Sequence, residues 1–390
     1  MLQKYYEERD KRKKEGLPPI PLKAQEVQEI ANAFENGSED SELLGLIENQ
    51  VSPGVDEAAY VKAAFLKDLA LEKTKTNLIT PQKSIQLLGT MLGGYSVEAL
   101  VEVLKKGKFA AEAAEALKNT ILVYDSFNEI FELSKNNSHA KSILESWANA
   151  EWFENKPTLD KEIELTIYKV SGETNTDDFS PAKEAWSRPD IPLHAQAFLK
   201  FSENIEKPLE ELNKLRSDGS QLVFVGDVVG TGSSRKSAVN SMLWHMGSDI
   251  PFVPAKRTGG FCFGNKIAPI FYNTLQDSGA FPLELDVDKL EHGKKIILRP
   301  YSGEVLDSKT GNILSTFNLK TDVIFDEIRA GGRINLIIGR QLTDKTREKL
   351  GLDPSDKFHR YGEDKQTNKG FTLAQKMVGK ACGVKGIRPG

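Results

Sequence analysis

The stretch GDVVGTGSSRKSAVNSMLWHM, residues 226–246, decides the fold of the region around it. The four residues before it, 222–225, are all apolar and are typical of a buried strand. Gly230 and Gly232 then loosen the backbone. A helix is predicted directly afterwards, because apolar residues recur at helical spacing at Ala238, Val239, Met242, Leu243 and Met246. The sequence therefore predicts a strand, a glycine-rich turn and the start of a helix.

The predicted start of this helix is suited to binding an anion. The first backbone N–H groups of a helix have no partner inside it and carry a partial positive charge. Ser233, Ser234 and Arg235 stand at this point, and their hydroxyls and guanidinium can bind a carboxylate or a phosphate. The positive charge of Arg235 is unfavourable beside the positive end of the helix dipole unless a bound anion compensates it. The alternative is a plain turn in which the serines only cap the helix.

Two nucleotide-binding motifs look like this stretch, and it satisfies neither of them. A dinucleotide fingerprint requires a third glycine three residues after Gly232, where Arg235 stands. A Walker loop requires a glycine directly before Lys236 and Ser237, and Arg235 again takes that position. Nucleotide binding at residues 230–237 is therefore a hypothesis that we do not expect to hold.

The sequence before residue 157 predicts helices. Residues 1–20 form a charged leader, and short apolar stripes separated by short polar breaks follow over residues 22–154. Asp56 is placed to cap one of these helices. The lengths of the elements suit stacked antiparallel helix pairs, as in HEAT-type solenoids, although no repeat is evident in the sequence.

The pattern changes near residue 157. Apolar and polar residues alternate over residues 163–167, which predicts a strand, and a β-rich run follows over residues 296–317. A helix is predicted over residues 267–275. Beyond Leu350 the sequence is polar and typical of a loop, with one short helix over residues 372–378.

Two further segments are predicted to be loops. Residues 173–178 are polar, and residues 259–264 combine three glycines with a lone cysteine, Cys262. A single buried thiol is more often inert than catalytic. Asp177 in the first loop and Arg188 further along the segment 175–193 are candidate site residues, although an acid in a loop often only forms an Asx-turn and Arg188 is also compatible with a surface side chain.

Composition excludes several classes of protein. Hydrophobic residues make up 39% and charged residues 28% of the 390 residues, and the net charge is −4, which argues against general affinity for nucleic acid. No apolar run reaches transmembrane length, and the N-terminus is too charged for a secretory signal, so we expect no membrane partner and a cytoplasmic location. Two distant cysteines and five scattered histidines predict no metal site.

Six sequence motifs point to one family. They are SPGVDEAAYVKAAFL at 52–66, LLGTMLGGY at 87–95, TDDFSPAKEAWSRPDIPLHA at 176–195, GDVVGTGSSRKSA at 226–238, IAPIFYNT at 267–274 and FTLAQKMVGKACGVKGIRPG at 371–390. Through them the chain resembles the N-terminal part of the bacterial aconitate hydratase B family over essentially its whole length. Motifs of this length do not match those of a family by chance.

The resemblance implies a multidomain α and α/β architecture. A HEAT-like α-helical solenoid is expected over residues 1–156, an aconitase swivel domain of β/β/α type over residues 157–350, and a linker over residues 351–390. In the family this linker leads to cluster-bearing domains, which follow the point where this chain ends. Three cysteines of those domains hold a [4Fe–4S] cluster, and Cys262 and Cys382 cannot supply three ligands. We therefore expect no cofactor bound by this chain.

The resemblance also implies roles for individual residues. Ser233 matches the base that removes a proton from a substrate carbon, and Asp177 matches its partner acid. Ser234, Arg235 and Arg188 match substrate contacts, although the spacing from Asp177 to Arg188 is one residue shorter than in the mitochondrial-type enzyme. The chemistry is coherent, because guanidinium groups bind the carboxylates of citrate bidentately and an electropositive pocket favours a serine alkoxide.

The function implied by the resemblance is that of part of an aconitate hydratase. Such an enzyme is a hydro-lyase that interconverts citrate and isocitrate through cis-aconitate, and the isolated chain is expected to be inactive. The alternative is a protein- or RNA-interaction module, in which the helical domain mediates self-association into a homodimer or contacts an mRNA.

Overall fold

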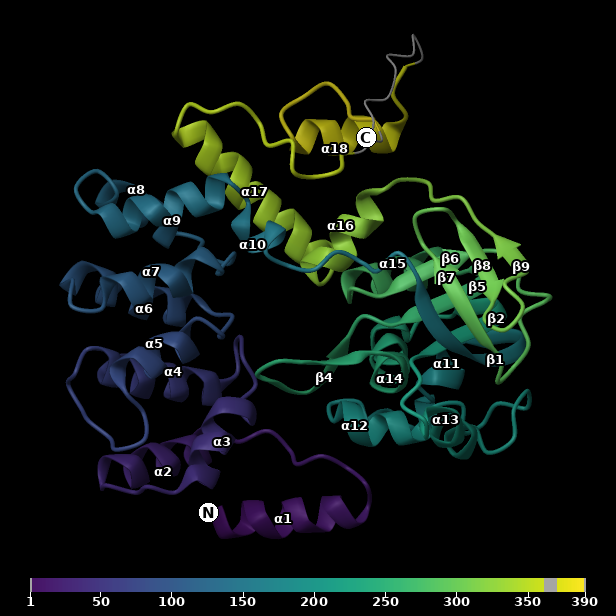
Figure 1. Cartoon of the computed structure of the whole chain (residues 1–390), viewed down its shortest axis with the longest axis horizontal. Coiled ribbons are helices and arrows are strands. Elements are labelled where there is room, and N and C mark those ends of the chain that lie inside the picture. Colours follow the sequence, from purple (N-terminus) through teal and green to yellow (C-terminus); the bar gives the residue numbers. More distant parts are fainter. Residues whose placement is uncertain (1, 361–369, 389–390) are drawn as a thin grey trace.

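The computed structural model describes residues 2–360 and 370–388, which form a helical lobe and a lobe built around a sheet (Figure 1). None of the helices in the described part of the chain combines the length and the apolar character that a membrane crossing requires. The helices of the helical lobe are α1 (Leu2–Lys14), α2 (Ala24–Glu35), α3 (Ser41–Asn49), α4 (Glu57–Ala70), α5 (Pro81–Leu88), α6 (Gly94–Lys106), α7 (Ala110–Lys118), α8 (Ser126–Leu133), α9 (Ser138–Ala148) and α10 (Glu151–Glu154).

Helices α1 to α9 share one hydrophobic core, whereas Trp152 and Phe153 of α10 belong to a separate cluster with Val323, Ala330 and Leu336. The apolar stripe of α2 is buried, and its Phe34 stacks on Phe65 of α4 with the ring centroids 6.3 Å apart. Successive helices pack together, α4 against α5, α6 against α7 and α7 against α9. The predicted cap is confirmed, because the Asp56 carboxylate accepts a hydrogen bond from the backbone N–H of Ala58 at 2.9 Å.

The second lobe is organised around a mixed sheet of seven strands in the order β6-β5-β2-β1-β7-β8-β9. Neighbours among β6, β5, β2 and β1 are parallel, and the remaining pairs are antiparallel. The strands of the sheet are β1 (Ile163–Asn175), β2 (Leu222–Thr231), β5 (Phe261–Ile267), β6 (Phe281–Glu284), β7 (Lys295–Arg299), β8 (Glu304–Asp307) and β9 (Ile313–Thr316). A separate hairpin pairs β3 (Ser248–Ile250) with β4 (Val253–Thr258).

Strand β2 is buried on both faces, which explains its continuous apolar run. Val223 and Val225 join one hydrophobic cluster, and Phe224 between them joins the cluster on the opposite face. The predicted strand, turn and helix are confirmed, because β2 ends at Thr231 and α14 begins at Arg235. The remaining helices are α11 (Thr176–Phe179), η1 (Ala182–Ser187), α12 (Ile191–His194), η2 (Ala195–Ala197), α13 (Pro208–Arg216), α14 (Arg235–Met246), α15 (Pro269–Asp277), α16 (Val323–Ala330), α17 (Arg333–Lys349) and α18 (Leu373–Ala381).

Two predicted loops are wrong. Residues 261–264 belong to the inner strand β5, in which Cys262 is fully buried and pairs with Phe224. The preceding Gly259 and Gly260, at φ +79° and +84°, make the turn into this strand. Residues 173–175 continue β1, and residues 176–178 begin α11. Residues 261–264 and 173–175 are paired with neighbouring strands, and local composition cannot reveal these partners.

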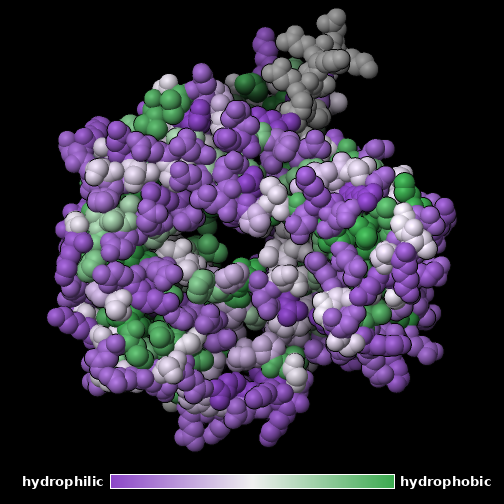
Figure 2. Space-filling model, in the orientation of Figure 1, coloured by the Kyte–Doolittle hydropathy of each residue, from purple (hydrophilic) through white to green (hydrophobic). Residues whose placement is uncertain are grey.

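Several contacts join the two lobes across the opening visible between them in Figure 2. Helix α17 packs against α9, and the Trp152 indole N–H donates a hydrogen bond to Thr343 Oγ1 at 3.0 Å. At the tip of the β3–β4 hairpin, Phe252 packs against the core of the helical lobe. At the opposite end of the helical lobe, the buried Arg12 of α1 forms an ion pair with Asp190, just before α12.

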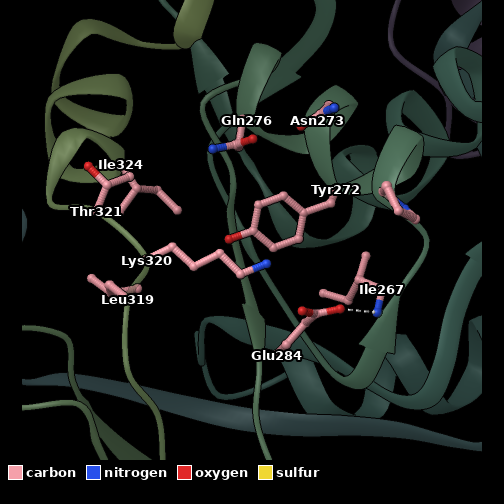
Figure 3. A pocket seen from close by; sticks show the side chains of 10 residues that line it. Ile267, Tyr272, Asn273, Gln276, Glu284, Leu319, Lys320, Thr321 and Ile324 are labelled. Carbon is pink, nitrogen blue, oxygen red and sulfur yellow. Dashed lines mark hydrogen bonds between the residues drawn. The ribbon is translucent and has the colours of Figure 1, made fainter. Parts of the chain in front are cut away.

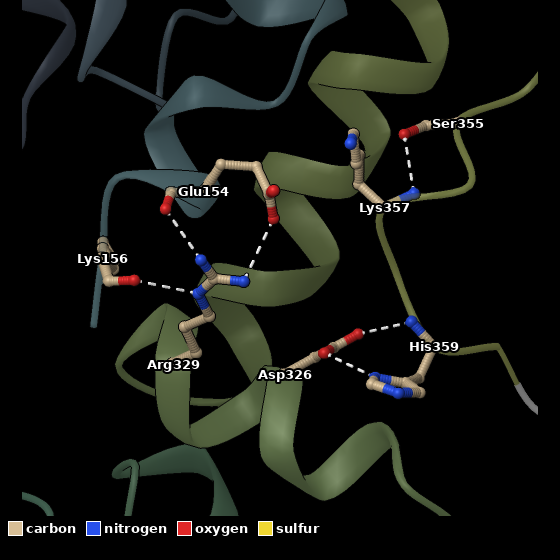
Figure 4. A network of polar contacts seen from close by, with 7 residues as sticks. All are labelled: Glu154, Lys156, Asp326, Arg329, Ser355, Lys357 and His359. Atoms are coloured by element: carbon tan, nitrogen blue, oxygen red, sulfur yellow. Dashed lines mark hydrogen bonds and ion pairs between the residues drawn. The ribbon is translucent and has the colours of Figure 1, made fainter. Parts of the chain in front are cut away.

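A polar network holds the connection between the lobes on α16 (Figure 4). Arg329 donates to the backbone oxygens of Glu154 and Lys156 at 2.7 and 3.0 Å and pairs with the Glu154 carboxylate. On the same helix, the buried Asp326 accepts from the backbone N–H and the ring Nδ1 of His359, at 2.6 and 2.8 Å. These contacts fix both the segment that enters the sheet lobe and the segment that leaves it.

Candidate functional site

The ends of two parallel strands bring Asp177 and Ser233 to the same edge of the sheet. Asn175 of β1 and Thr231 of β2 are paired residues. Asp177 and Ser233 each follow one of these paired residues by two positions, and both are exposed. Since the carboxyl ends of parallel strands open on one edge, this edge is where α/β proteins bind ligands.

The glycine-rich turn is shaped by its contact with α11. Gly232 has φ +102°, and a Cβ atom at this position would lie 2.6 Å from Thr176 Oγ1. The backbone N–H of Ser234 donates to the same Thr176 oxygen at 3.2 Å. Gly230, at φ +80°, leaves room for the ring of Phe271. The two glycines are therefore required by backbone conformation and by close approach of neighbouring side chains.

The serines of this turn do not cap α14. Ser234 occupies the N-cap position, but its hydroxyl makes no capping hydrogen bond and instead accepts from Arg188 Nη2 at 3.2 Å. The Asx-turn alternative for Asp177 is also wrong. Asn175 is the residue that caps α11, since its side chain accepts from the backbone N–H groups of Asp177 and Asp178 at 2.7 and 3.2 Å.

Arg188 is a partly buried residue that faces the turn, so its interpretation as a free surface side chain is wrong. Its Nε donates to Ser180 Oγ at 3.2 Å, and its Nη2 donates to the Ser180 carbonyl at 3.1 Å. Together with the bond to Ser234, these contacts hold one edge of the guanidinium. Nη1 has no hydrogen bond to the described residues and is left for another acceptor.

Arg235 is the first residue of α14, as predicted. Its Nη1 donates to the carbonyl of Ser233 at 3.3 Å, and the first turn of α14 contains no acidic residue. A cation at the N-terminus of a helix is electrostatically unfavourable by itself. Arg188 and Arg235 therefore bring two guanidinium groups to this turn, and the carboxylates of Glu173, Asp177 and Asp178 lie at the same edge of the sheet.

Behind Arg188 lies a buried cluster of hydroxyl groups around one histidine, which the sequence did not single out. Ser180 Oγ contacts His194 Nε2 and Ser237 Oγ, both at 2.8 Å. The other ring nitrogen of His194 contacts Ser187 Oγ at 2.8 Å. Burial, and then the charge of Arg188, lower the pKa of His194. The only local signal was the presence of polar residues within the apolar stretch around residues 191–201.

A separate cavity of about 280 Å³ lies beyond the carboxyl ends of β5 and β6 (Figure 3). Tyr272, Lys320 and Glu284 contribute polar atoms to it. Glu284 accepts from the backbone N–H of Ile267 at 3.0 Å, and Gln276 donates to Glu327 at 2.7 Å. None of the residues predicted from sequence lines this cavity.

The described residues do not fit a [4Fe–4S] cluster. No group of three or more His, Cys, Asp or Glu side chains among them could hold a metal ion. Cys262 is fully buried within β5, where burial raises the pKa of its thiol, and Cys382 is exposed just after α18. Two cysteines on separate elements cannot replace the three thiolates that the resemblance requires.

Two family models match the chain. A model described as the N-terminus of aconitate hydratase 2 matches residues 165–371, and one described as the aconitate B N-terminal domain matches residues 4–153.

Curated relatives match the whole chain. Aconitate hydratase B of Escherichia coli is 53% identical over 401 residues, covering 100% of this chain and 46% of the relative. Aconitate hydratase B of Synechocystis is 53% identical over 394 residues, covering 100% of this chain and 45% of the relative. The chain thus spans about half the length of the curated relatives it matches.

One solved structure, a 3-isopropylmalate dehydratase from Methanocaldococcus jannaschii, aligns with 48% of this chain and 99% of its own at 16% identity. The TM-score is 0.34, which is too low to establish a shared fold.

Proposed function

This chain belongs to the aconitate hydratase B family, and on that premise we propose that it supplies part of an aconitase active site. The proposed reaction is the reversible isomerisation of citrate and isocitrate through cis-aconitate, by dehydration and rehydration. The observation that carries the proposal is the convergence of Asp177, Ser233 and the Arg188–Ser234 hydrogen bond at one edge of the sheet.

The arginines of this edge are the proposed binding groups for substrate carboxylates. Arg188 is anchored through Nε and Nη2 and presents Nη1. Arg235 lies at the start of α14, where backbone N–H groups also favour an anion. A forked guanidinium binds a carboxylate through two parallel hydrogen bonds, which is the mode proposed for Arg235. Nη1 of Arg188 and the hydroxyl of Ser234 are proposed to contact a second carboxylate, so that the orientation of a tricarboxylate is fixed.

Ser233 is the proposed base, with Asp177 as its partner acid. A serine hydroxyl is a weak base at its ordinary pKa and requires an environment that stabilises the alkoxide. The helix start and the two arginines provide positive potential at this position. Ser233 is exposed in this chain, so the water-poor surroundings that such a base requires must come from another part of the enzyme.

The described residues do not fit the cluster that the family implies, because the two cysteines lie on separate elements and no group of side chains among these residues could hold a metal ion. The [4Fe–4S] cluster is therefore proposed to belong to the remaining part of the full-length enzyme. The full-length enzyme is the protein in which this chain makes up about half of the length, as it does in the curated relatives. The chain alone is expected to leave cis-aconitate unchanged.

The finer architecture is part of the same proposal. The helical lobe is proposed to be a HEAT-like solenoid over residues 1–156, supported by its successive packed helices. The sheet lobe is proposed to be the swivel domain over residues 157–350, and residues 351–390 the linker. Homodimer formation, contact with an mRNA and a cytoplasmic location stay predictions that rest on the family alone.

Replacement of Ser233 tests the assignment of the base. In the full-length enzyme, Ser233→Ala is expected to lower kcat for citrate by roughly a hundredfold to ten-thousandfold, because a positioned general base contributes that much. The measurement is the formation of cis-aconitate, followed by its ultraviolet absorbance. The matched control is Ser217→Ala, which removes an exposed hydroxyl after α13 and should leave kcat unchanged. Equal kcat values for Ser233→Ala and the unsubstituted enzyme would exclude Ser233 as the base.

A further inference from the structure

His194, the last residue of α12, is held between two hydroxyl groups in the interior of the sheet lobe. Only 2% of its surface is exposed. Its Nε2 lies 2.8 Å from Ser180 Oγ and its Nδ1 lies 2.8 Å from Ser187 Oγ. The ring therefore has a defined partner on each side, and one of these partners is the residue that anchors Arg188.

The hydrogen bonds around Ser180 favour a proton on Nε2 of His194. Ser237 Oγ donates to the carbonyl of Ser234 at 3.0 Å, so it accepts the hydroxyl proton of Ser180 at 2.8 Å. Ser180 Oγ then has only acceptor positions left, and Arg188 Nε takes one of them. In this arrangement His194 Nε2 is the donor to the other, so the neutral ring has its proton on Nε2.

On the other side of the ring, Ser187 Oγ lies 2.8 Å from both His194 Nδ1 and the carbonyl oxygen of Glu184. The lowered pKa of His194 favours the neutral ring at pH 7, in which Nδ1 is an acceptor when Nε2 carries the proton. The Ser187 hydroxyl has one proton, and in this tautomer it donates that proton to Nδ1 in place of the Glu184 carbonyl. The His194 ring thus links the Ser187 hydroxyl to the Ser180 hydroxyl. The Ser180 hydroxyl in turn accepts a hydrogen bond from the guanidinium of Arg188.

We propose that His194 is a positioning residue for Arg188, which orients the guanidinium towards the substrate by donating a hydrogen bond from Nε2 to Ser180 Oγ. The inference rests on the proposed function, because it assigns a role within the same site. With Ser180 fixed, the Nε and Nη2 edge of Arg188 is anchored, and Nη1 is the nitrogen without a hydrogen bond to the described residues. Without the His194 donor, the Ser180 hydroxyl is free to rotate and the anchor of Arg188 is loosened.

Kinetics of the full-length enzyme test this role. His194→Leu removes the donor at similar size, and it is expected to raise the KM for citrate roughly tenfold with a smaller change in kcat, because substrate binding is what Arg188 provides. His194→Gln keeps an N–H donor at the end of a side chain of similar reach and should restore most of the affinity. A KM for His194→Leu equal to that of the unsubstituted enzyme would overturn the proposal.

A second buried histidine provides the matched control. His245 of α14 is 5% exposed, and its Nε2 donates to the carbonyl of Ala195 at 2.9 Å. It has no contact with Ser180 or Arg188 among the described residues. His245→Leu should therefore destabilise the protein without changing the KM for citrate. An equal rise in KM for both leucine variants would show a general effect of core disruption and would also overturn the proposal.

Nuclear magnetic resonance of the 390-residue chain separates this inference from the proposed function. Nitrogen-15 spectra of the histidine rings are expected to show His194 as the neutral Nε2–H tautomer at pH 7. The Nε–H resonance of Arg188, identified by its loss in Arg188→Lys, should shift in His194→Leu and stay in place in His245→Leu. An Nδ1–H tautomer, or an unshifted Arg188 resonance, overturns the inference. An inactive full-length enzyme with the expected spectra would instead contradict only the proposed function.

Discussion

At the scale of single residues, the site depends on the close contact between Gly232 and Thr176. The turn passes so near α11 that only hydrogen fits at the Gly232 Cα, and the threonine oxygen also receives the N–H of Ser234. One residue therefore sets the distance between the segment that carries Ser233 and the segment that carries Asp177. At Gly232, the positive φ and the contact with Thr176 both disfavour any side chain.

Gly232→Ala tests this contact. The substitution is expected to destabilise the chain by roughly 1–3 kcal/mol through the positive φ, and more if Thr176 cannot move away. In the full-length enzyme it should lower kcat/KM by on the order of a hundredfold, because a shift of about 1 Å in a catalytic group has effects of that size. Urea unfolding and steady-state kinetics measure the two effects.

Gly219→Ala is the control for backbone conformation alone. Gly219 has φ +81°, and no atom lies within 4 Å of the position that a Cβ would take. Because of this positive φ, Gly219→Ala should lower the free energy of unfolding by a similar amount, and it should leave kcat/KM unchanged. If both variants had the same kcat/KM, the contact with Thr176 would have no role in the site.

At the scale of elements, α11 is a single helical turn and depends on its cap. Asn175 accepts hydrogen bonds from the N–H groups of Asp177 and Asp178, and the Asp178 carboxylate accepts from the N–H of Asn175 at 2.8 Å. This capping box closes the end of β1 and fixes the direction in which Asp177 leaves the sheet. A helix of this length cannot persist without such contacts.

Asn175→Ala is expected to cost about 0.5–2 kcal/mol of stability, the usual value of an N-cap. It should also lower kcat of the full-length enzyme, since Asp177 loses its fixed position. Asn137→Ala is the matched control, because Asn137 caps α9 of the helical lobe through the N–H of Ala140 at 3.0 Å. Thermal unfolding and kcat should separate the two variants. A loss of kcat in both would contradict a specific role for the α11 cap.

At the scale of the whole molecule, the ion pair of Arg12 and Asp190 connects the N-terminal helix to the loop beside Arg188. Arg12 Nη1 and Nη2 lie 2.5 and 3.1 Å from the two carboxylate oxygens, and Arg12 Nε donates to the carbonyl of Pro18 at 2.6 Å. Asp190 also caps α12 by accepting from the N–H of Leu193 at 3.2 Å. The pair thus joins residues 178 positions apart in the chain.

Arg12→Ala is expected to destabilise the chain by roughly 3 kcal/mol, because it leaves Asp190 without its partner in a largely buried position. Hydrogen exchange should increase in both α1 and α12. Arg9→Ala is the control, since Arg9 pairs with Glu42 inside the helical lobe at an exposed position, where an ion pair contributes at most about 1 kcal/mol. Unchanged exchange in α12 after Arg12→Ala would show that the contact does not connect the lobes.

Much of the fold follows from local pattern. The alternation over residues 163–167 predicted β1, the run at residues 222–225 predicted β2, and the glycines before Arg235 predicted the turn into α14. Backbone sterics, capping and apolar periodicity act over a few residues, so a sequence carries them directly. The family resemblance supplied the site residues Asp177, Arg188, Ser233, Ser234 and Arg235, which local pattern alone left open.

Only the tertiary structure decided what those residues contact. Residues 259–264 read as a loop because their glycines are visible locally, whereas the neighbours that make β5 a buried strand lie elsewhere in the chain. The same holds for His194, whose two ring nitrogens contact Ser180 and Ser187, and for Arg12, whose partner lies in the other lobe. The sequence by itself determined the local elements. Strand pairing and burial determined the contacts of the site, because both depend on residues distant in the chain.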